Sequence, residues 1–346
     1  MFQNLTIQFI TFFIPNRDLR HRLRSKYKRK TQYQIIRDEN AKLRQDINRI
    51  KTQLQNLRTQ LRNEYKNLNY KYALPEQRPQ MLKDWFKERT GSNLNLDNPK
   101  TLNEKIQWIK LNDLDDLKSR LTDKYAVRDW VKEKIGEKYL IPLLGVYERP
   151  EDINWDALPN EFVIKCNHGC GWIIIVKDKN TIDRDKIGAQ LNRWLNTTYG
   201  INSFELQYFK IPPKLLIEKK LENKANEGLV NYRFWCFNGK VEFIQFHTDK
   251  YFTENVCAFY STSWVKQNFS YNHPIMEQDI EKPVNIKEMM GLAQTLCKGF
   301  KLVRVDLYQM NDGTIYFGEM TFTPCMGIGE WYGQDMGVEF GNLLKL

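Results

Sequence analysis

Apolar side chains recur along residues 36–61 at alternating spacings of four and three positions, which is the spacing of a heptad repeat. The members of this heptad seam are Ile36, Asn40, Leu43, Ile47, Ile50, Leu54, Leu57 and Leu61. The pattern predicts a helical, coiled-coil region over residues 31–75 that could join chains into a homo-oligomer. Asn40 would favour one register and a low oligomer number. The same spacing also serves a helix that packs on its own globular domain, so both interpretations stay open.

The pattern changes near residue 80, where we place the start of a globular domain, residues 80–346. Pro75 and Pro79 interrupt the helical periodicity, and residues 91–101 are rich in turn formers. Residues 101–134 then return to helical spacing. They open on TLNE at 101–104, the pattern of a capping box, and an apolar face is expected from Trp108, Leu111, Leu114 and Leu117.

Beyond residue 134, short apolar and aromatic runs are typical of β-strands. They cover residues 139–147, 161–166, 172–178, 215–221, 232–249, 302–310 and 314–322. Asn238-Gly239 and the Asn-Asp-Gly sequence at 311–313 supply the turns of two hairpins. These features predict an α+β domain with antiparallel sheets.

Charge is distributed unevenly between the two regions. The chain carries a net charge of +11, yet residues 1–90 hold 21 Lys and Arg against 8 Asp and Glu. A basic arm on a near-neutral body predicts docking to an anionic surface. Few aromatic residues are interleaved with the cations of this arm, and it has no recognised nucleic-acid reading motif, which argues against nucleic acid as the partner.

An apolar run at residues 5–14 precedes the basic residues 17–30. It is too short for a bilayer span of about twenty residues, and in a secretory signal the charge would come first. Residues 1–30 are therefore predicted to form an amphipathic, membrane-proximal segment that binds peripherally. A start that packs on the body is the alternative. The six cysteines show no CxxC pair or zinc-ligand spacing, which indicates reduced thiols in a cytoplasmic protein.

Residues 161–178 have the features of a phosphate-binding element. An apolar strand ends in Lys165, and a loop with Gly169 and Gly171 leads into the next strand. Glycines let backbone N–H groups turn toward an anion, and a lysine supplies a point charge. The motif alone is common, so its meaning depends on the rest of the chain.

Residues 302–327 place two carboxylates, Asp306 and Glu319, near facing positions of a predicted hairpin. Mg²⁺ is typically held by one or two carboxylates together with substrate phosphates. Arg304 projects from the same strand face as Asp306 by the period of two, where it could neutralise developing negative charge. A solvated cross-strand charge cluster is the alternative, although the apolar and aromatic surroundings make burial of unused charges costly.

In chain order, these segments resemble the ATP-grasp superfamily, and most closely its TupA-like branch, which is found in bacterial surface-polysaccharide loci. The resemblance covers about residues 95–335. It is carried by KTLNEKIQWIKL (100–111), TDKYAVRDWV (122–131), NEFVIKCNHGCGW (160–172), LLIEKKLE (215–222), NYRFWCFNGKV (231–241) and VRVDLY…FGEMTFTPCMG (303–327). The implied fold has two α+β subdomains whose antiparallel sheets sandwich ATP.

The resemblance implies a nucleotide site assembled from several segments. Its members would be Lys124 and Lys165 on the phosphates, the covering loop with His168, Gly169, Gly171 and Trp172, the adenine hinge with Glu218, Lys219 and Leu221, and Asn231 with Arg233 near the ribose and phosphates. Arg304 and Arg233 would be the catalytic arginines, with Arg304 on the acyl phosphate or tetrahedral species.

The resemblance also implies a magnesium site. Asp306 and Glu319 would hold the ion. Many members of the superfamily have Asn two residues after the metal-binding Glu, whereas this chain has Thr321. Thr321 is therefore expected to be the third metal-binding residue, with a contact that could run through a water molecule. The alternative is that one magnesium ion has fewer protein ligands.

The implied reaction passes the γ-phosphate of ATP to a carboxylate and lets an amine displace phosphate from the acyl phosphate. The resemblance further implies a polysaccharide or lipid-linked glycan acceptor and an amino acid or other amine, joined at the inner face of the bacterial membrane. One alternative is a glycosyltransferase of the same pathway, with the acidic residues 113–116 as its metal motif. Another is a non-enzymatic scaffold built on the basic coiled coil.

Overall fold

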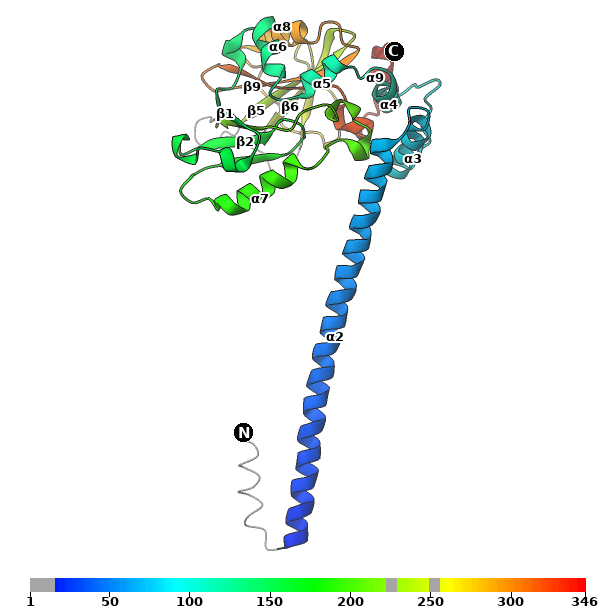
Figure 1. The fold of residues 1–346 in the computed structure, drawn as a ribbon. Helices are drawn as coiled ribbons and strands as arrows, with labels where there is room; N and C mark the ends of the chain where they lie inside the picture. Colours follow the sequence, from blue (N-terminus) through cyan, green and yellow to red (C-terminus); the bar gives the residue numbers. More distant parts are fainter. Residues whose placement is uncertain (1–15, 222–228, 249–255) are drawn as a thin grey trace. The chain divides into compact units, whose positions relative to one another are not determined.

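The computed structural model describes residues 16–221, 229–248 and 256–346 (Figure 1). Contacts divide the chain into two units, Met1–Leu68 and Asn69–Leu346. The predicted apolar run at residues 5–14 lies outside the described residues, so its membrane role stays a prediction. Within the ranges that are described, we find no helix with the length and apolarity that a membrane crossing requires.

From residue 16 onward, where the description of the first unit begins, its residues form helix α2 (Arg17–Tyr72), which continues past the unit's boundary. It begins after Asn16, whose side-chain Oδ1 accepts a hydrogen bond from the Leu19 backbone N–H at 3.0 Å. It ends at Tyr72, three residues before Pro75, as the sequence predicts. The apolar members of the heptad seam are all exposed in the single chain. The prediction of a helix is confirmed, and the partner of the seam stays a prediction.

Four further helices follow before the first strand. They are α3 (Arg78–Thr90), α4 (Leu102–Asn112), α5 (Asp116–Thr122) and α6 (Val127–Lys134). The capping box is confirmed, because the Thr101 and Glu104 side chains each bond the other's backbone N–H. The expected apolar face is wrong in detail. The buried stripe of α4 is Leu102, Ile106 and Ile109, whereas Leu117 lies exposed on α5.

The α+β class with antiparallel sheets is confirmed. A four-stranded sheet has the order β1-β4-β2-β3, with β1 (Leu143–Tyr147), β2 (Phe162–Cys166), β3 (Ile173–Val176) and β4 (Leu215–Lys219). Its neighbouring strands are all antiparallel. Helix α7 (Arg184–Leu195) buries Leu191 in the same core cluster as Phe162 and Ile164 of β2.

A five-stranded antiparallel sheet forms the second layer. Its order is β10-β9-β5-β6-β7, with β5 (Val230–Phe237), β6 (Lys240–Thr248), β7 (Ala258–Ser261), β9 (Leu302–Gln309) and β10 (Ile315–Thr321). The β5–β6 hairpin turns at Asn238 and Gly239, which both have positive φ, as the predicted Asn-Gly turn requires. A two-stranded sheet pairs β8 (Phe269–Tyr271) with β11 (Trp331–Gly333).

Helices cover the five-stranded sheet through two core clusters. One cluster joins strand residues such as Val305 to α8 (Ile286–Leu296) and α6. The other joins Trp235 to the buried stripe of α4 and to Phe340 of α9 (Gly337–Leu343). Short 3₁₀ helices occupy Glu137–Tyr139, Pro150–Asp152, Trp155–Ala157, Ile201–Ser203, Leu206–Tyr208 and Pro324–Gly327.

Helix α4 also buries a lysine. The Nζ atom of Lys110 donates hydrogen bonds to the carbonyl oxygens of Ser203 and Met326, both at 2.7 Å. Burial lowers the pKa of Lys110 to about 7, and the nearby Glu205 carboxylate offsets this only in part. A neutral amine still has two N–H donors for the two carbonyls. Deprotonation therefore relieves the cost of the buried charge without breaking either bond.

Stability should consequently rise with pH relative to a chain without this amine. Between pH 7 and the unfolded value of 10.5, the unfolded chain binds the Lys110 proton more tightly than the folded chain. The free energy of unfolding of wild type minus that of Lys110→Met should increase by up to about 1.4 kcal/mol per pH unit in this window. Urea denaturation of both proteins at pH 7, 8 and 9 measures the difference, and parallel pH profiles would contradict the assignment.

Candidate active site

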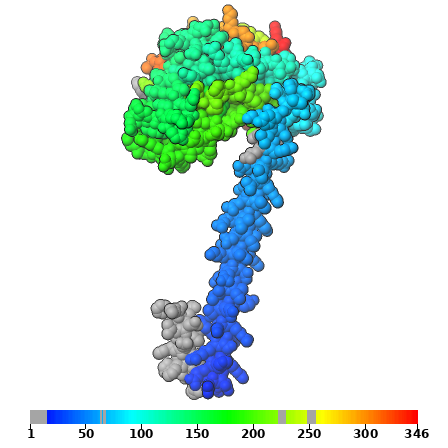
Figure 2. Space-filling model, viewed as in Figure 1, coloured from blue at the N-terminus to red at the C-terminus, as the bar shows by residue number. Residues whose placement is uncertain are grey.

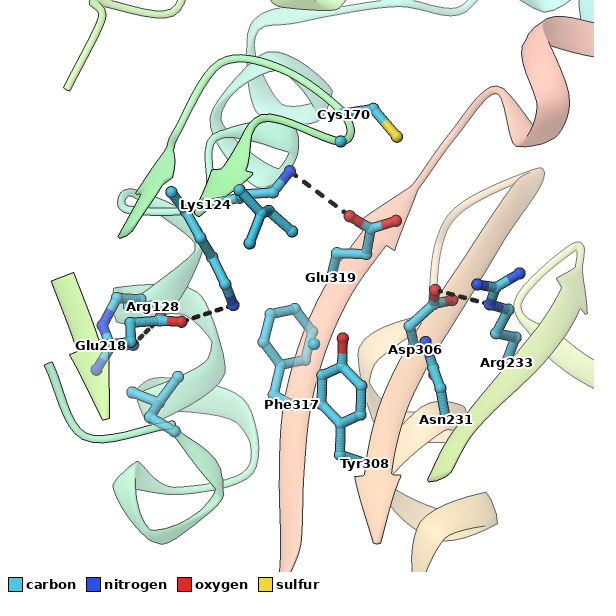
Figure 3. A pocket seen from close by; sticks show the side chains of 15 residues that line it. Lys124, Arg128, Cys170, Glu218, Asn231, Arg233, Asp306, Tyr308, Phe317 and Glu319 are labelled. Carbon is cyan, nitrogen blue, oxygen red and sulfur yellow. Dashed lines mark hydrogen bonds and ion pairs between the residues drawn. The ribbon is translucent and has the colours of Figure 1, made fainter. Parts of the chain in front are cut away.

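A cavity of ≈ 770 Å³, counting its open mouth, lies between the two larger sheets. Strands β2, β3 and β4 line one side, strands β5, β9 and β10 line the other, and residues at and before α6 close it (Figure 3). Eight of its fifteen lining residues have charged or amide side chains. They are Lys124, Arg128, Lys165, Glu218, Asn231, Arg233, Asp306 and Glu319.

Asp306 of β9 and Glu319 of β10 lie directly opposite one another in the strand register, as the sequence predicts. The register shifts between Phe317 and Glu319, because Gly318 is one extra residue in β10. A Cβ on Gly318 would lie 3.0 Å from the Asp306 carbonyl oxygen, so a side chain there would crowd the paired strand. This bulge therefore sets the pairing of the two carboxylates.

Arg304 holds Asp306 from the same strand. Its Nε and Nη2 atoms donate to the two carboxylate oxygens of Asp306 at 2.7 and 2.8 Å, and Nη2 also reaches Glu319 at 3.2 Å. On the neighbouring strand β5, the Arg233 Nε lies 3.6 Å from Asp306 Oδ2. Two guanidinium groups thus fix one carboxylate, which still has lone pairs for a further ligand.

Thr321 lies beside the carboxylate pair without lining the cavity. Its hydroxyl donates to Glu319 Oε1 at 2.9 Å and accepts from Arg304 Nη2 at 3.2 Å. The Thr321 hydroxyl therefore orients the Glu319 carboxylate without itself lining the cavity. Direct contact of Thr321 with a metal stays a prediction.

Glu319 is kept ionised by its neighbours. Burial alone would raise its pKa, but the charges of Lys124 and Arg304, with smaller contributions from Thr321 and Arg233, lower the pKa to about 2. The Lys124 Nζ lies 3.5 Å from Glu319 Oε2 and donates to the Gly169 carbonyl oxygen at 2.9 Å (Figure 3). Lys124 therefore connects β10 with the loop after β2.

A second ionic cluster lies across the cavity. Lys165, at the end of β2, donates to Glu218 Oε2 of β4 at 2.7 Å, and Arg128 of α6 lies 3.4 Å from Oε1. The Glu218 side chain is only 8% exposed, and that of Lys165 18%. Glu218 thus holds two cations at the cavity wall, a contact that the expected role in the adenine hinge did not anticipate.

The glycine-containing loop after β2 divides into a buried and an exposed half. His168 is buried, with its ring nitrogens 3.2 Å from Asn167 Oδ1 and from the Trp194 carbonyl oxygen. Trp172 stacks on Trp194 of α7 with ring centroids 6.1 Å apart. Only Cys170 and Gly171 of this loop line the cavity, and Gly171 adopts a positive φ of 74°.

The residues present fit a magnesium ion. Mg²⁺ prefers hard oxygen ligands and usually combines one or two carboxylates with substrate phosphates. Asp306 and Glu319 supply two carboxylates, and Asn231 supplies a buried amide oxygen without a hydrogen-bond partner. Among the described residues, no group of three or more His, Cys, Asp or Glu is placed to hold a metal. The carboxylate pair would therefore share its ion with nucleotide phosphates.

The structure brings most of the predicted site together. Of the predicted residues, Lys124, Lys165, Gly171, Glu218, Asn231, Arg233, Asp306 and Glu319 line the cavity, whereas His168, Gly169, Trp172, Lys219, Leu221, Arg304 and Thr321 do not. Sequence reasoning missed lining residues such as Arg128, Tyr308 and Phe317. All three sit inside the motifs quoted for the resemblance, which was an available signal.

The acidic residues 113–116, considered for a glycosyltransferase, have a structural role. Asp115 is the N-cap of α5, where its side chain accepts from the Lys118 backbone N–H. Asp113 pairs with Lys118 and with Lys301, each at 3.6 Å. None of these carboxylates lines the cavity between the sheets.

Residues 104–345 match the profile of the TupA-like ATP-grasp family. The chain belongs to this family, and its α+β domain has the ATP-grasp fold. No functionally curated protein matches the sequence.

Solved structures of ATP-grasp ligases are similar at low identity. D-cycloserine synthetase DcsG is 13% identical, with 65% of this chain and 69% of that chain covered and a TM-score of 0.37. The L-amino acid ligase from Bacillus licheniformis is 12% identical, with 60% and 44% covered and a TM-score of 0.36. D-alanine–D-alanine ligase from Bacillus anthracis, complexed with ATP, is 20% identical, with 59% and 55% covered and a TM-score of 0.31. The chain thus spans less than half of the Bacillus licheniformis ligase, and the assignment rests on the family match.

Proposed function

We propose that this protein is an ATP-dependent carboxylate–amine ligase. The observation that carries the proposal is the cavity in which Lys124, Lys165 and the Asp306–Glu319 pair converge from distant parts of a TupA-like ATP-grasp chain. In the first step a carboxylate oxygen of the substrate bonds to the γ-phosphorus of ATP, and ADP leaves. In the second step an amine nitrogen bonds to the acyl carbon, phosphate leaves, and the nitrogen loses a proton.

The chain's own residues would act by positioning and electrostatics. Lys124, just before α6, and Lys165 of β2 both line the cavity and would bind phosphate oxygens as point charges. Mg²⁺, held by Asp306 and Glu319, would neutralise phosphate charge. Arg233 lines the cavity next to Asp306. Arg304 lies outside the lining and holds Asp306 and Glu319 by hydrogen bonds. It would therefore act on an acyl phosphate through the two carboxylates that it holds, or its side chain would have to move toward the cavity.

The substrates we propose are a polysaccharide or a lipid-linked glycan precursor and an amino acid or other amine, joined for example at a uronic-acid carboxylate. The TupA-like family supports this choice. The basic arm supports a place at the inner face of a bacterial membrane, since residues 17–30 carry eight Lys and Arg against one Asp. Anionic headgroups attract such segments by about 1 kcal/mol per basic residue near the surface.

The test is phosphate release from Mg-ATP in the presence of the twenty amino acids and candidate uronic-acid acceptors. We expect release only when an acceptor and an amine are both present, and mass spectrometry should detect the amide. Asp306→Asn is the inactive comparison. Equal phosphate release by wild type and this variant under every combination would show that the carboxylate pair is not the reaction centre. Turnover with nucleotide sugars and none with ATP would favour the glycosyltransferase.

A further inference from the structure

The heptad seam of α2 is an apolar surface without a described partner. Its apolar members are between 44% and 59% exposed, and Leu68 continues the spacing at 53%. Figure 2 shows the side chains of α2 projecting along the helix. Most helical stability in proteins comes from packing an amphipathic face, and exposed ion pairs such as Arg49–Asp46 at 3.3 Å add little. A helix of 56 residues therefore needs a surface to cover this seam.

The charges beside the seam select the orientation of a partner helix. If Asn40, Ile47, Leu54 and Leu61 take the a positions of the heptad, the e positions are Arg37, Arg44, Lys51 and Arg58. An antiparallel pair would set these cations against one another, because e faces e in that arrangement. A parallel pair instead sets each g position against the e position five residues further along the partner.

The g positions carry the complementary charges where they are needed. Glu39 would face Arg44 of the partner subunit, and Asp46 would face Lys51 of the partner subunit. The remaining g positions, Gln53 and Gln60, are neutral and repel nothing. Charge at e and g sets partner choice and orientation in coiled coils. The pattern thus favours a second copy of this chain in parallel orientation.

Asn40 sets the register and the number of chains. A polar Asn at one a position is best accommodated opposite an identical Asn, which occurs only when two parallel helices are in register. A shift by one heptad would set Asn40 against Ile47 of the partner subunit and bury an amide without a hydrogen-bond partner. Such an Asn lowers stability but specifies a single arrangement.

We infer that α2 forms a parallel, in-register, two-stranded coiled coil between two copies of this chain, along the seam from Ile36 to Leu61. The inference is independent of the proposed ligase activity. The parallel arrangement sets the basic residues 17–30 of both copies at the same end of the coiled coil. An anionic surface would therefore meet twice the positive charge of a single chain, and binding there would gain from two attached sites.

Cysteine cross-linking of the full-length chain tests the orientation. Leu43→Cys and Leu57→Cys, both at d positions, should each form a disulfide-linked dimer on mild oxidation. Thr59→Cys, two residues from Leu57 but at the outward f position, is the matched control. The unsubstituted chain is oxidised in parallel, which measures any linkage through its own exposed Cys170. We expect at least tenfold more linked dimer from each d variant than from the control.

The two d variants together exclude the other arrangements. In an antiparallel pair, a residue faces its own copy at only one place along the helix, where the two-fold axis crosses it. Such a pair cannot join position 43 to 43 and also position 57 to 57. Disulfide linkage only in a mixture of the two variants would refute the parallel orientation. Equal linkage of Thr59→Cys would show that the helices do not meet along the heptad seam.

Solution mass tests the number of chains. Light scattering should give twice the chain mass of 41.4 kDa, and Leu54→Asp, at the centre of the seam, should give the single mass. The surface variant Thr52→Asp should remain dimeric, because position f faces solvent. A wild-type mass of one or three chains would refute the inference.

Discussion

Replacing Glu319 by Gln should reduce ligase turnover by about 10²–10³-fold and raise the Mg²⁺ concentration needed to bind ATP. Glu319 faces Asp306 across the bulge at Gly318, and its pKa, lowered to about 2, keeps it ionised at neutral pH. The amide has nearly the same shape but no negative charge. It would weaken the metal position and leave the ammonium group of Lys124 without its partner at 3.5 Å.

Isothermal titration of Mg-ATP at several Mg²⁺ concentrations measures the effect without knowledge of the acceptor. Glu330→Gln is the matched control, since Glu330 is an exposed residue eleven positions along the chain and does not line the cavity. Circular dichroism checks that both variants are folded. Unchanged Mg²⁺ dependence in Glu319→Gln would exclude this carboxylate as a metal ligand.

Replacing Lys165 by Met should weaken both ATP binding and the fold. A charge-assisted hydrogen bond contributes about 1.5–3 kcal/mol, so loss of the phosphate contact should raise the Kd for ATP by about 10-fold to 100-fold. The change also strips Glu218 of its 2.7 Å partner. Breaking a buried ion pair costs about 3–5 kcal/mol. The expected loss is nearer about 2 kcal/mol, because Arg128 still lies 3.4 Å from Glu218.

A double variant separates these two effects. Lys165→Met combined with Glu218→Gln removes the uncompensated charge, so the free energy of unfolding should recover most of the loss, whereas ATP affinity should not recover. Lys177→Met, in the turn after β3 and outside the cavity lining, is the comparison for loss of a lysine. If the double variant bound ATP as tightly as wild type, Lys165 would have only a structural role.

Local sequence patterns predicted the strands and the carboxylate pair because the information lies within single hairpins. Asn238-Gly239 specifies a turn with two positive φ values, and the Asn-Asp-Gly turn joins β9 to β10. The position of Glu319 opposite Asp306 was predicted, but its cause was not. A bulge at Gly318 depends on the close approach of β9, which the sequence of β10 alone does not contain.

Long-range contacts escaped the same reasoning. Arg128 reaches Glu218 over 90 positions, and no local pattern joins α6 to β4. Trp172 stacks on Trp194 of α7, a contact that the sequence of its own loop does not indicate. Pro79 was interpreted as a helix breaker, but it lies in the first turn of α3, where a missing N–H costs nothing. For Arg128 and Trp172 the deciding partner lies outside the sequence window, whereas for Pro79 the local pattern allowed both a helix end and a helix start.

The two bonds of Lys124 have a consequence for ligand binding in the cleft. One ammonium group ties a strand of the five-stranded sheet, through Glu319, to the loop of the four-stranded sheet, through the Gly169 carbonyl. An ammonium group has three N–H donors, so an anion could bind the donor that neither of these two partners takes. A phosphate bound at this ammonium group would therefore share one cation with both sheets, so the side chain that spans the cleft would also hold its ligand.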